Sequence, residues 1–511
     1  MIKKKEYLFQ LIKSLTKEEK RNFKLLAGKY NSAKKNNYIR LFNAIDKQDV
    51  YDEEAIKNEF RTETFIKQLT VTKYYLQRQI IRSLQNLHCE NSVGMLVLSL
   101  HQQVAILFAK GQYELCREIV QKGIDVSSRH ELFLEMIGFL KWELDLINKT
   151  NLADYKISLE KYFERTSQLL NWYDINTRGN HLMNELQIFS LDTPTFGFYN
   201  SQYPASIEKI NNFIDTVDVD SLPLKARINL LYPLAQYYLM LSDFKEAYCI
   251  YYRMFEELKD EYRQKMLHEP YINTLTGLIY SSGARKKPDT LKIALSELQQ
   301  VPEINLRVKY KKAESLSYYP LFLCALNGDF HAGFTAIEIV ENFLETYSDD
   351  NIYAQFMYAY YYTAYIYFGA GNLTQALKYI RNTDAYYSKD LLPNLRLAIQ
   401  IMEMIIFYEQ KKYDLADSRL RRLQRQIQKE TNIKTFLSHF LRYFRKLILS
   451  GMDLTENTQH YQQLLNRLMQ IPVKDQITML INFDLISWTQ SKLENCTFGE
   501  KIKENSARLL R

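Results

Sequence analysis

The stretch YAQFMYAYYYTAYIYFGAGNLTQALKYI, from Tyr353 to Ile380, contains eight tyrosines. Tyrosine-rich runs favour β-strands by intrinsic preference, but this run passes directly into TQALKYI, which is typical of a helix. The small residues Ala364 and Ala376 lie on either side of Gly371-Asn372. They would let two helices approach each other closely. The stretch therefore predicts a helical hairpin with its turn at Gly371-Asn372.

The composition of the whole chain favours the same interpretation. The 511 residues are 46% hydrophobic, which excludes a wholly disordered chain. Only 15 glycines and 10 prolines interrupt them, as expected for long helices with short connections. We therefore predict an all-α protein.

Neither a membrane segment nor a metal-binding cysteine framework is predicted. The first residues, MIKKKEYLFQLIKSLTKEEK, contain no secretory apolar run, and no stretch approaches the length of a membrane span. The five cysteines are scattered and include no CxxC pair, which argues against disulfide frameworks and structural zinc. We expect a cytoplasmic protein that does not associate with a membrane.

A second stretch repeats the pattern of the first. Leu234-Ala235-x2-Tyr238, then Phe244-x2-Ala247-x3-Tyr251, aligns with Thr363-Ala364-x2-Tyr367, then Leu373-x2-Ala376-x3-Ile380. This pattern resembles the tetratricopeptide repeat, which implies an α-solenoid of helical hairpins. Turns at Gly328, Gly371 and Lys411 are 43 and 40 residues apart, whereas that family has a period of about 34. The hairpins are therefore expected to be lengthened.

The repeat pattern predicts a boundary between two domains. Residues 1–90 form a basic N-terminal helical domain, and residues 91–511 form the solenoid. Extrapolating the spacing predicts a further hairpin near 266–300 and two more within 131–220. The clearest repeats are predicted at 97–130, 228–260, 314–346, 357–388 and 397–430.

The N-terminal domain does not follow the repeat. Thr16-x-x-Glu19 is a capping-box signature, and residues 62–87 predict a long amphipathic helix after a shorter one. Two interpretations stay open: a bundle that caps the solenoid, or a helix-turn-helix whose basic residues contact phosphates. Those basic residues are Lys67, Lys73, Arg78 and Arg82. The opening LTKEEKRNF also resembles a group of bacterial helical proteins whose role is not known, so it implies no chemistry.

No catalytic, cofactor-binding or metal site is predicted. The phosphate-binding patterns GxxxxGK[ST] and GxGxxG, the nucleophile motif GxSxG and the zinc motif HExxH are all absent. The histidines are dispersed, and the paired carboxylates fall near expected helix ends. We expect a protein that is not an enzyme.

Two surfaces are candidates for binding. If the tetratricopeptide register holds, one set of side chains faces a concave groove suited to a peptide or helix, although the same rings would also suit a core. These candidates are Tyr232, Gln236, Tyr318, Phe322, Tyr358, Tyr361, Tyr365 and Phe368.

The second surface is basic. Residues 411–446 hold 11 Lys or Arg against 3 Asp or Glu, and residues 1–90 hold 19 against 11. Within residues 411–446, one helix face would carry Arg421, Arg422, Arg425 and Lys429. This face would suit an anion or simply aid solubility. We predict a non-enzymatic scaffold that binds a protein or peptide. The alternative is a regulator that binds nucleic acid through residues 1–90 or the 411–446 patch.

Overall fold

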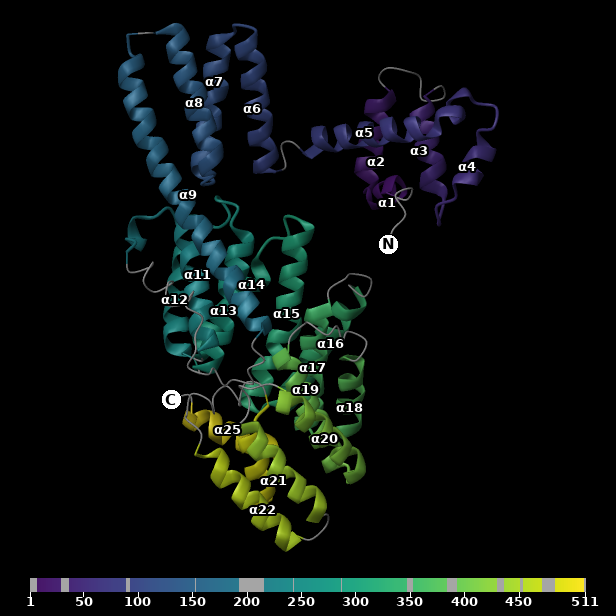
Figure 1. The fold of residues 1–511 in the computed structure, drawn as a ribbon, viewed down its shortest axis with the longest axis vertical. Coiled ribbons are helices and arrows are strands. Elements are labelled where there is room, and N and C mark those ends of the chain that lie inside the picture. Colours follow the sequence, from purple (N-terminus) through teal and green to yellow (C-terminus); the bar gives the residue numbers. More distant parts are fainter. Residues whose placement is uncertain are drawn as a thin grey trace. The chain divides into compact units, whose positions relative to one another are not determined.

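The computed structural model describes residues 7–28, 36–88, 92–151, 153–192, 216–241, 243–285, 287–346, 353–383, 393–429, 436–450, 454–470 and 483–509. These residues form helices joined by turns and include no β-strand (Figure 1). The predicted all-α class is therefore confirmed. Within these ranges, none of the helices is long and apolar enough to cross a lipid bilayer. The chain divides into two compact units, Met1–Leu170 and Asn171–Arg511.

The first unit begins with a small group of helices that has its own core. These are α1 (Tyr7–Ser14), α2 (Lys17–Gly28), α3 (Asn37–Lys47), α4 (Glu53–Glu59), the 3-10 helix η2 (Thr64–Gln68) and α5 (Leu69–His88). The rings of Phe23 and Phe42 meet in this core with centroids 4.7 Å apart. Leu76 and Ile80 of α5 are fully buried in the same core, so the predicted amphipathic helix is present. It begins at Leu69 and not at residue 62, because the first predicted turns form the 3-10 helix η2.

Polar caps set where these helices begin. The backbone N–H of Thr16 donates to the Glu19 carboxylate over 2.7 Å, and the N–H of Glu19 donates to the Thr16 hydroxyl over 3.2 Å. This is the capping box predicted from the sequence. Asn36 and Asp52 cap α3 and α4 in the same way, by accepting backbone N–H groups of the first turn.

The rest of the first unit contains longer helices. These are α6 (Val93–Ala109), α7 (Tyr113–Arg129), α8 (Phe133–Thr150) and the first part of α9 (Tyr155–Asp192). The helices α6, α7 and α8 pack against one another in sequence. Gly123 permits the close approach of α7 and α8, because a Cβ atom there would lie 2.3 Å from the ring of Phe139.

The prediction of two hairpins within residues 131–220 is wrong. The described residues of that stretch form α8 and then one continuous α9 of 38 residues. No proline interrupts α9, and its single glycine, Gly179, does not end the helix. Instead, Gly179 lets α9 lie against the backbone of α11, where a Cβ atom would be 2.3 Å from the Asn229 carbonyl oxygen.

The second unit contains the second part of α9 and a succession of helices that follow it. It contains η3 (Val219–Ser221), α11 (Leu224–Met240), α12 (Phe244–Leu258), α13 (His268–Ala284), α14 (Pro288–Gln300), α15 (Leu306–Asn327), α16 (Phe330–Thr346), α17 (Tyr353–Gly369), α18 (Leu373–Asn382), α19 (Pro393–Glu409), α20 (Tyr413–Lys429), α21 (Phe436–Ser450), α22 (Leu454–Leu468), α24 (Leu485–Glu494) and α25 (Phe498–Leu509).

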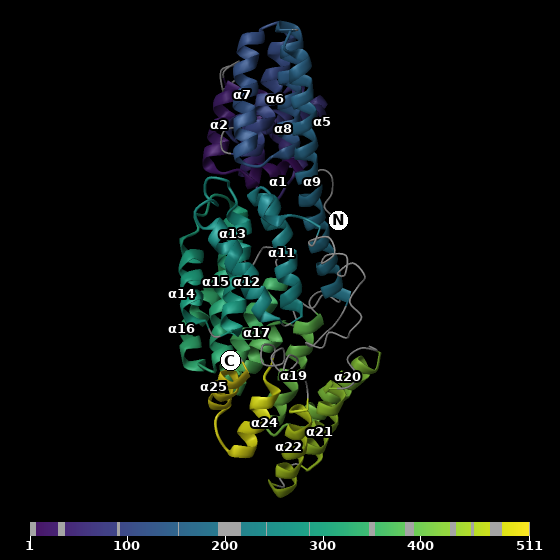
Figure 2. The same cartoon turned by 90° about the vertical axis from the view of Figure 1, so that its left-hand side faces the viewer.

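These helices are arranged as a solenoid. From α11 to α22 each helix packs against the next, and α11, α13, α15, α17 and α19 also pack against one another in that order (Figures 1 and 2). They form an inner row, and the intervening helices lie outside it. Glycines at the contacts allow this packing: a Cβ atom on Gly277 would lie 2.2 Å from the buried ring of Tyr251. The predicted solenoid-like class is therefore confirmed.

The hairpin turns share a backbone signature. Gly111, Gly328, Gly371 and Lys411 have φ angles of 71°, 66°, 82° and 58°, respectively. This left-handed region is open to glycine and costly for other residues. Gly328, Gly371 and Lys411 are the positions at which the sequence pattern placed turns, and each of the five predicted hairpins contains two helices among its described residues.

The hairpin predicted near 266–300 is present as α13 and α14. Pro288 is the first residue of α14, where its missing N–H leaves no helical hydrogen bond unmade. The tyrosine-rich stretch forms α17 and α18, so the helical interpretation of Tyr353–Ile380 is confirmed. The Asn372 side chain caps α18 by accepting the N–H of Gln375 over 3.1 Å.

Candidate functional site

The inner row of helices presents one polar and aromatic stripe from each of four successive helices. Residues three or four positions apart share a helix face, and the stripes follow this spacing. They are Tyr232 and Gln236 on α11, Asn273, Thr276 and Tyr280 on α13, Lys311, Glu314, Tyr318 and Phe322 on α15, and Tyr358 and Tyr362 on α17.

These stripes line a cavity of about 470 Å³ within the second unit. Its wall is built from rings that pack on one another. The rings of Tyr318 and Tyr358 stack with centroids 5.6 Å apart, and those of Tyr280 and Phe322 stack at 4.9 Å. Because each ring is held by another ring, the wall is rigid and largely preformed. The volume lies within the range of sites that hold small molecules or short segments of a partner.

Polar groups sit between the rings. The Gln236 amide donates to the buried Tyr251 hydroxyl over 2.7 Å, which fixes its orientation. Asn273 and Thr276 lie one turn apart on α13, and Lys311 and Glu314 lie one turn apart on α15. The cavity therefore offers amide and hydroxyl groups together with one charge of each sign.

The phenols of the cavity are neutral at physiological pH. Burial raises the pKa of Tyr232 to about 12, and the Glu314 carboxylate adds to the effect of burial against an opposing hydrogen bond with Gln236. Burial likewise raises the pKa of Tyr318 and Tyr358. Neutral phenols can donate hydrogen bonds and present electron-rich faces, but they are poor bases. This chemistry suits recognition more than catalysis.

Five of the eight predicted groove residues lie around this cavity. They are Tyr232, Gln236, Tyr318, Phe322 and Tyr358. The sequence interpretation missed Tyr280 and Tyr362, which also line it. A signal for both was available: Tyr362 is four residues after Tyr358, as Phe322 is after Tyr318, and Tyr280 lies in the hairpin that the 43-residue spacing predicted.

The assignment of Tyr361, Tyr365 and Phe368 to an open groove is wrong. These side chains are buried, and the C-terminal segment covers Tyr365 and Phe368. The rings of Phe483 and Phe498 lie 5.4 Å and 6.1 Å from the ring of Tyr365 and 5.4 Å and 5.5 Å from that of Phe368.

The covering segment is also bonded in place. The backbone N–H of Asp484 donates to the Tyr365 hydroxyl over 3.3 Å. The Trp488 indole N–H donates to the Glu409 carboxylate over 2.8 Å, so α24 is fixed to α19. Figure 1 shows the yellow C-terminal helices against the green ones, and α25 packs on α15. This face belongs to the core of the unit.

The predicted basic patch lies on α20. Ala416, Leu420 and Leu423 form its buried stripe. Arg421, Arg422 and Arg425 are exposed, and Arg421 pairs with Asp417 over 2.5 Å. The side chain of Lys429 lies outside the described residues. The patch thus carries three exposed arginines, one of which has an acidic partner.

A second cavity, of about 490 Å³, lies in the first unit between α7, α8 and the start of α9. Apolar residues such as Leu140 and Leu144 line it together with Glu143 and Arg165. Burial raises the pKa of Glu143 against the effect of Arg165. No sequence motif pointed to this cavity, because each of its three helices contributes residues at i, i+3, i+4 and i+7, which is the spacing of any helix face. It holds one ring, Tyr162, among its lining residues.

Neither metal ligands nor known relatives identify a chemistry. Among the described residues, no group of three or more His, Cys, Asp or Glu side chains could hold a metal ion. No family model matches this chain, and no curated protein matches it either. The likeness to the tetratricopeptide repeat therefore stays a prediction from the residues quoted above.

Proposed function

We propose that the second unit is a non-enzymatic scaffold that binds a segment of another protein, or a peptide, in the aromatic cavity. The observation that carries this proposal is the cavity of about 470 Å³, whose wall includes the stacked rings of Tyr318 and Tyr358 and the ring of Tyr232. Large rigid aromatic side chains give much contact area at low entropic cost. Side chains of a packed core would fill a space of this size, whereas this space is open.

The polar groups of the cavity favour a peptide over a purely apolar ligand. The side-chain amides of Gln236 and Asn273 each carry a donor and an acceptor, which match those of a peptide bond. The volume accommodates a few side chains, so the ligand contributes one or two large apolar residues and the backbone between them. We place this activity in the cytoplasm and assign it no catalytic step.

A peptide-display experiment tests the proposal. A random peptide library is selected on the full-length protein, and the affinity of the recovered peptides is measured for Tyr318→Ala and Tyr358→Ala. Each substitution removes a ring from the wall and should weaken binding by about tenfold or more, as for buried aromatic anchors elsewhere. Tyr252→Ala is the matched control, because Tyr252 is an exposed tyrosine on α12 that does not line the cavity.

The possible outcomes separate clearly. Recovery of no peptide would contradict the proposed function. Recovery of peptides whose affinity is unchanged in both cavity variants would show that they bind to another surface. Circular dichroism of each variant checks that loss of binding is not loss of folding.

A further inference from the structure

The helix α5 presents an exposed face that no other described helix covers. Along it, Val71, Tyr74 and Ile81 are 49%, 61% and 42% exposed. Positions 70, 71, 74, 77, 78, 81, 82 and 85 fall on one face at helical spacing, and all are exposed. The side chains on this face are Thr70, Val71, Tyr74, Gln77, Arg78, Ile81, Arg82 and Gln85.

The charge of this face has one sign. The helix Leu69–His88 contains no aspartate or glutamate. Arg78 and Arg82 are exposed on it, and the exposed Lys67 lies just before it in η2. Residues 1–90 as a whole carry 19 basic against 11 acidic residues. An anionic partner would therefore meet no negative charge on α5 itself.

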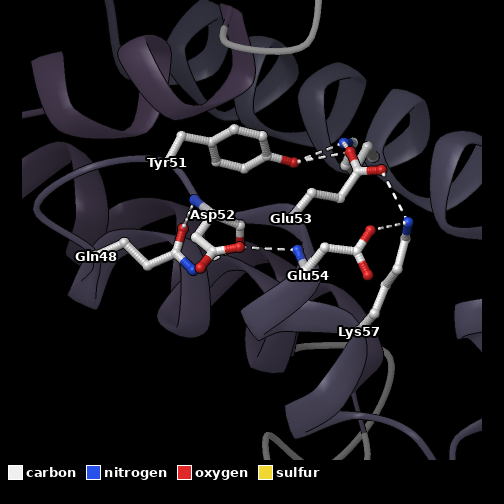
Figure 3. Close-up of polar contacts among 7 residues, drawn as sticks. Gln48, Tyr51, Asp52, Glu53, Glu54 and Lys57 are labelled. Carbon is white, nitrogen blue, oxygen red and sulfur yellow. Dashed lines mark hydrogen bonds and ion pairs between the residues drawn. The ribbon is translucent and has the colours of Figure 1, made fainter.

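Lys73 does not belong to this surface. Its ammonium donates to the Glu53 carboxylate over 2.6 Å and to the Tyr51 hydroxyl over 2.7 Å, so its predicted role as a phosphate contact is wrong. Figure 3 shows Tyr51 and Glu53 pointing toward each other, with Lys57 reaching Glu53 and Glu54. The hydrogen bond from Lys73 lowers the pKa of Glu53 to about 2. Lys73 thus ties α5 to α4 and leaves the outer arginines to a partner.

The helix is held rigidly from behind. Leu76 and Ile80 are fully buried, and the Asn22 amide of α2 donates to the Ser83 hydroxyl and carbonyl oxygens, each over 3.2 Å. Four residues, 60–63, separate α4 from the helical run that begins with η2 and continues as α5. A short helix, a turn of three or four residues and a longer helix is the layout of many DNA-reading domains.

We propose that the exposed face of α5 binds duplex DNA in the major groove. A helix fits that groove in B-form DNA, whereas the major groove of an RNA duplex is too narrow. The exposed Arg78 and Arg82 would contact phosphates, glutamine pairs with the edge of adenine, and the apolar Val71 and Ile81 suit thymine methyl groups. A partner helix would instead need a continuous apolar stripe, and here Gln77, Arg78 and Arg82 interrupt it.

The binding assay uses the full-length protein and a fluorescently labelled DNA duplex of mixed sequence. Fluorescence anisotropy gives the affinity at salt concentrations from about 50 mM to about 200 mM, over which phosphate contacts lose strength steeply. The double variant Arg78→Gln, Arg82→Gln should bind about tenfold more weakly or worse at low salt. Its salt dependence should fall by about two units of slope, one for each lost phosphate contact.

Two matched variants assign the effect to α5. Lys122→Gln with Arg129→Gln makes the same charge change at exposed positions of α7, and it should leave the affinity nearly unchanged. Arg421→Gln with Arg422→Gln and Arg425→Gln removes the other basic patch and should also leave it nearly unchanged. The cavity variant Tyr318→Ala should bind DNA normally, since this proposal does not rest on peptide binding.

Three results would overturn the proposal. The first is no DNA binding at low salt, which would favour a protein partner for this face. The second is equal loss of affinity in the α7 control pair, which would show that net charge alone is responsible. The third is loss of affinity in the α20 variant with none in the α5 variant, which would move the DNA site to the second unit.

Discussion

The helix α17 carries tyrosines on two neighbouring faces that meet different surroundings. On one face, Tyr358 is partly exposed and lines the open cavity. On the other, Tyr361 and Tyr365 are 1% and 2% exposed, and rings of the C-terminal segment cover Tyr365. The residue type and the helix are the same. What differs is the segment that lies opposite, so the identity of a side chain alone does not separate a binding surface from a core.

The largest expected effect comes from removing a ring from the covered face. Tyr365→Ala leaves a cavity among Phe330, Phe483 and Phe498 and removes the acceptor for the Asp484 N–H. We expect a loss of about 3–5 kcal/mol in the free energy of unfolding, as for other buried aromatic side chains. Urea unfolding followed by amide hydrogen exchange in α17 and α24 measures it.

The matched change on the open face is Tyr358→Ala. Because Tyr358 is only partly buried, we expect a loss of about 1 kcal/mol. Equal losses at the two positions would contradict the division of α17 into a core face and a cavity face.

The next effect tests how tightly the covering segment is packed. A Cβ atom on Gly328 would lie 2.5 Å from the backbone oxygen of Gly499 in α25, and its φ of 66° already disfavours other residues. We expect Gly328→Ala to destabilise the second unit by about 2–3 kcal/mol.

Gly371→Ala supplies the comparison for that change. Gly371 has a similar φ of 82°, but a Cβ atom there meets nothing within 4 Å. We expect a loss of about 1 kcal/mol from the backbone conformation alone. If both glycines gave the same loss in thermal unfolding, the close contact between Gly328 and Gly499 would not exist in solution.

Alkaline pH probes the cavity face. The pKa of Tyr232 is raised from 10.0 to about 12 by burial, so its neutral form stabilises the fold. That contribution is complete below pH 10 and is lost as pH rises from 10 through about 12. Tyr232→Phe cannot ionise, so its stability should fall less steeply there, by up to about 1.4 kcal/mol per pH unit. Parallel stability curves for the two proteins between pH 9 and 11.5, measured by urea unfolding, would show that Tyr232 is well solvated.

The smallest effect tests the assigned turn positions of the hairpins, from which the two faces of α17 were predicted. Lys411 occupies a turn position that holds glycine in three other hairpins, with a φ of 58°. Lys411→Gly should stabilise the second unit by about 0.5–1 kcal/mol, since glycine enters this conformation without strain. Lys412→Gly is the control, because Lys412 is exposed next to it and is absent from the residues with positive φ. A stabilising effect of the control alone would contradict the assigned turn.

The sequence predicts local structure well where a local signal exists. Gly111, Gly328 and Gly371 mark turns because their conformation is available mainly to glycine. The paired residues Tyr318 and Phe322 predicted a cavity-lining stripe because their spacing of four residues is fixed by the helix itself. These features depend on residues close together in the chain.

Features that depend on distant residues were not predictable in the same way. Tyr365 and Asp484 are 119 residues apart, so nothing near Tyr365 in the sequence indicates that it is covered. The division of the first 90 residues from the rest was predicted because the repeat pattern begins only after them, and α1–α5 do share a separate core. The two compact units, however, divide at Leu170. The continuous α9 was missed because the repeat spacing was extended across a stretch that lacks turn residues.

The most direct test measures whether a ligand covers position 358. Tyr358→Cys and Tyr365→Cys are treated with N-ethylmaleimide, and peptide-mapping mass spectrometry follows modification at each position. We predict fast modification at position 358, slowed about tenfold by a display-selected peptide at about ten times its Kd, and little modification at position 365 throughout. A peptide that binds without protecting position 358, or fast modification at position 365, would contradict the proposal that one face of α17 is a binding site and the other a core.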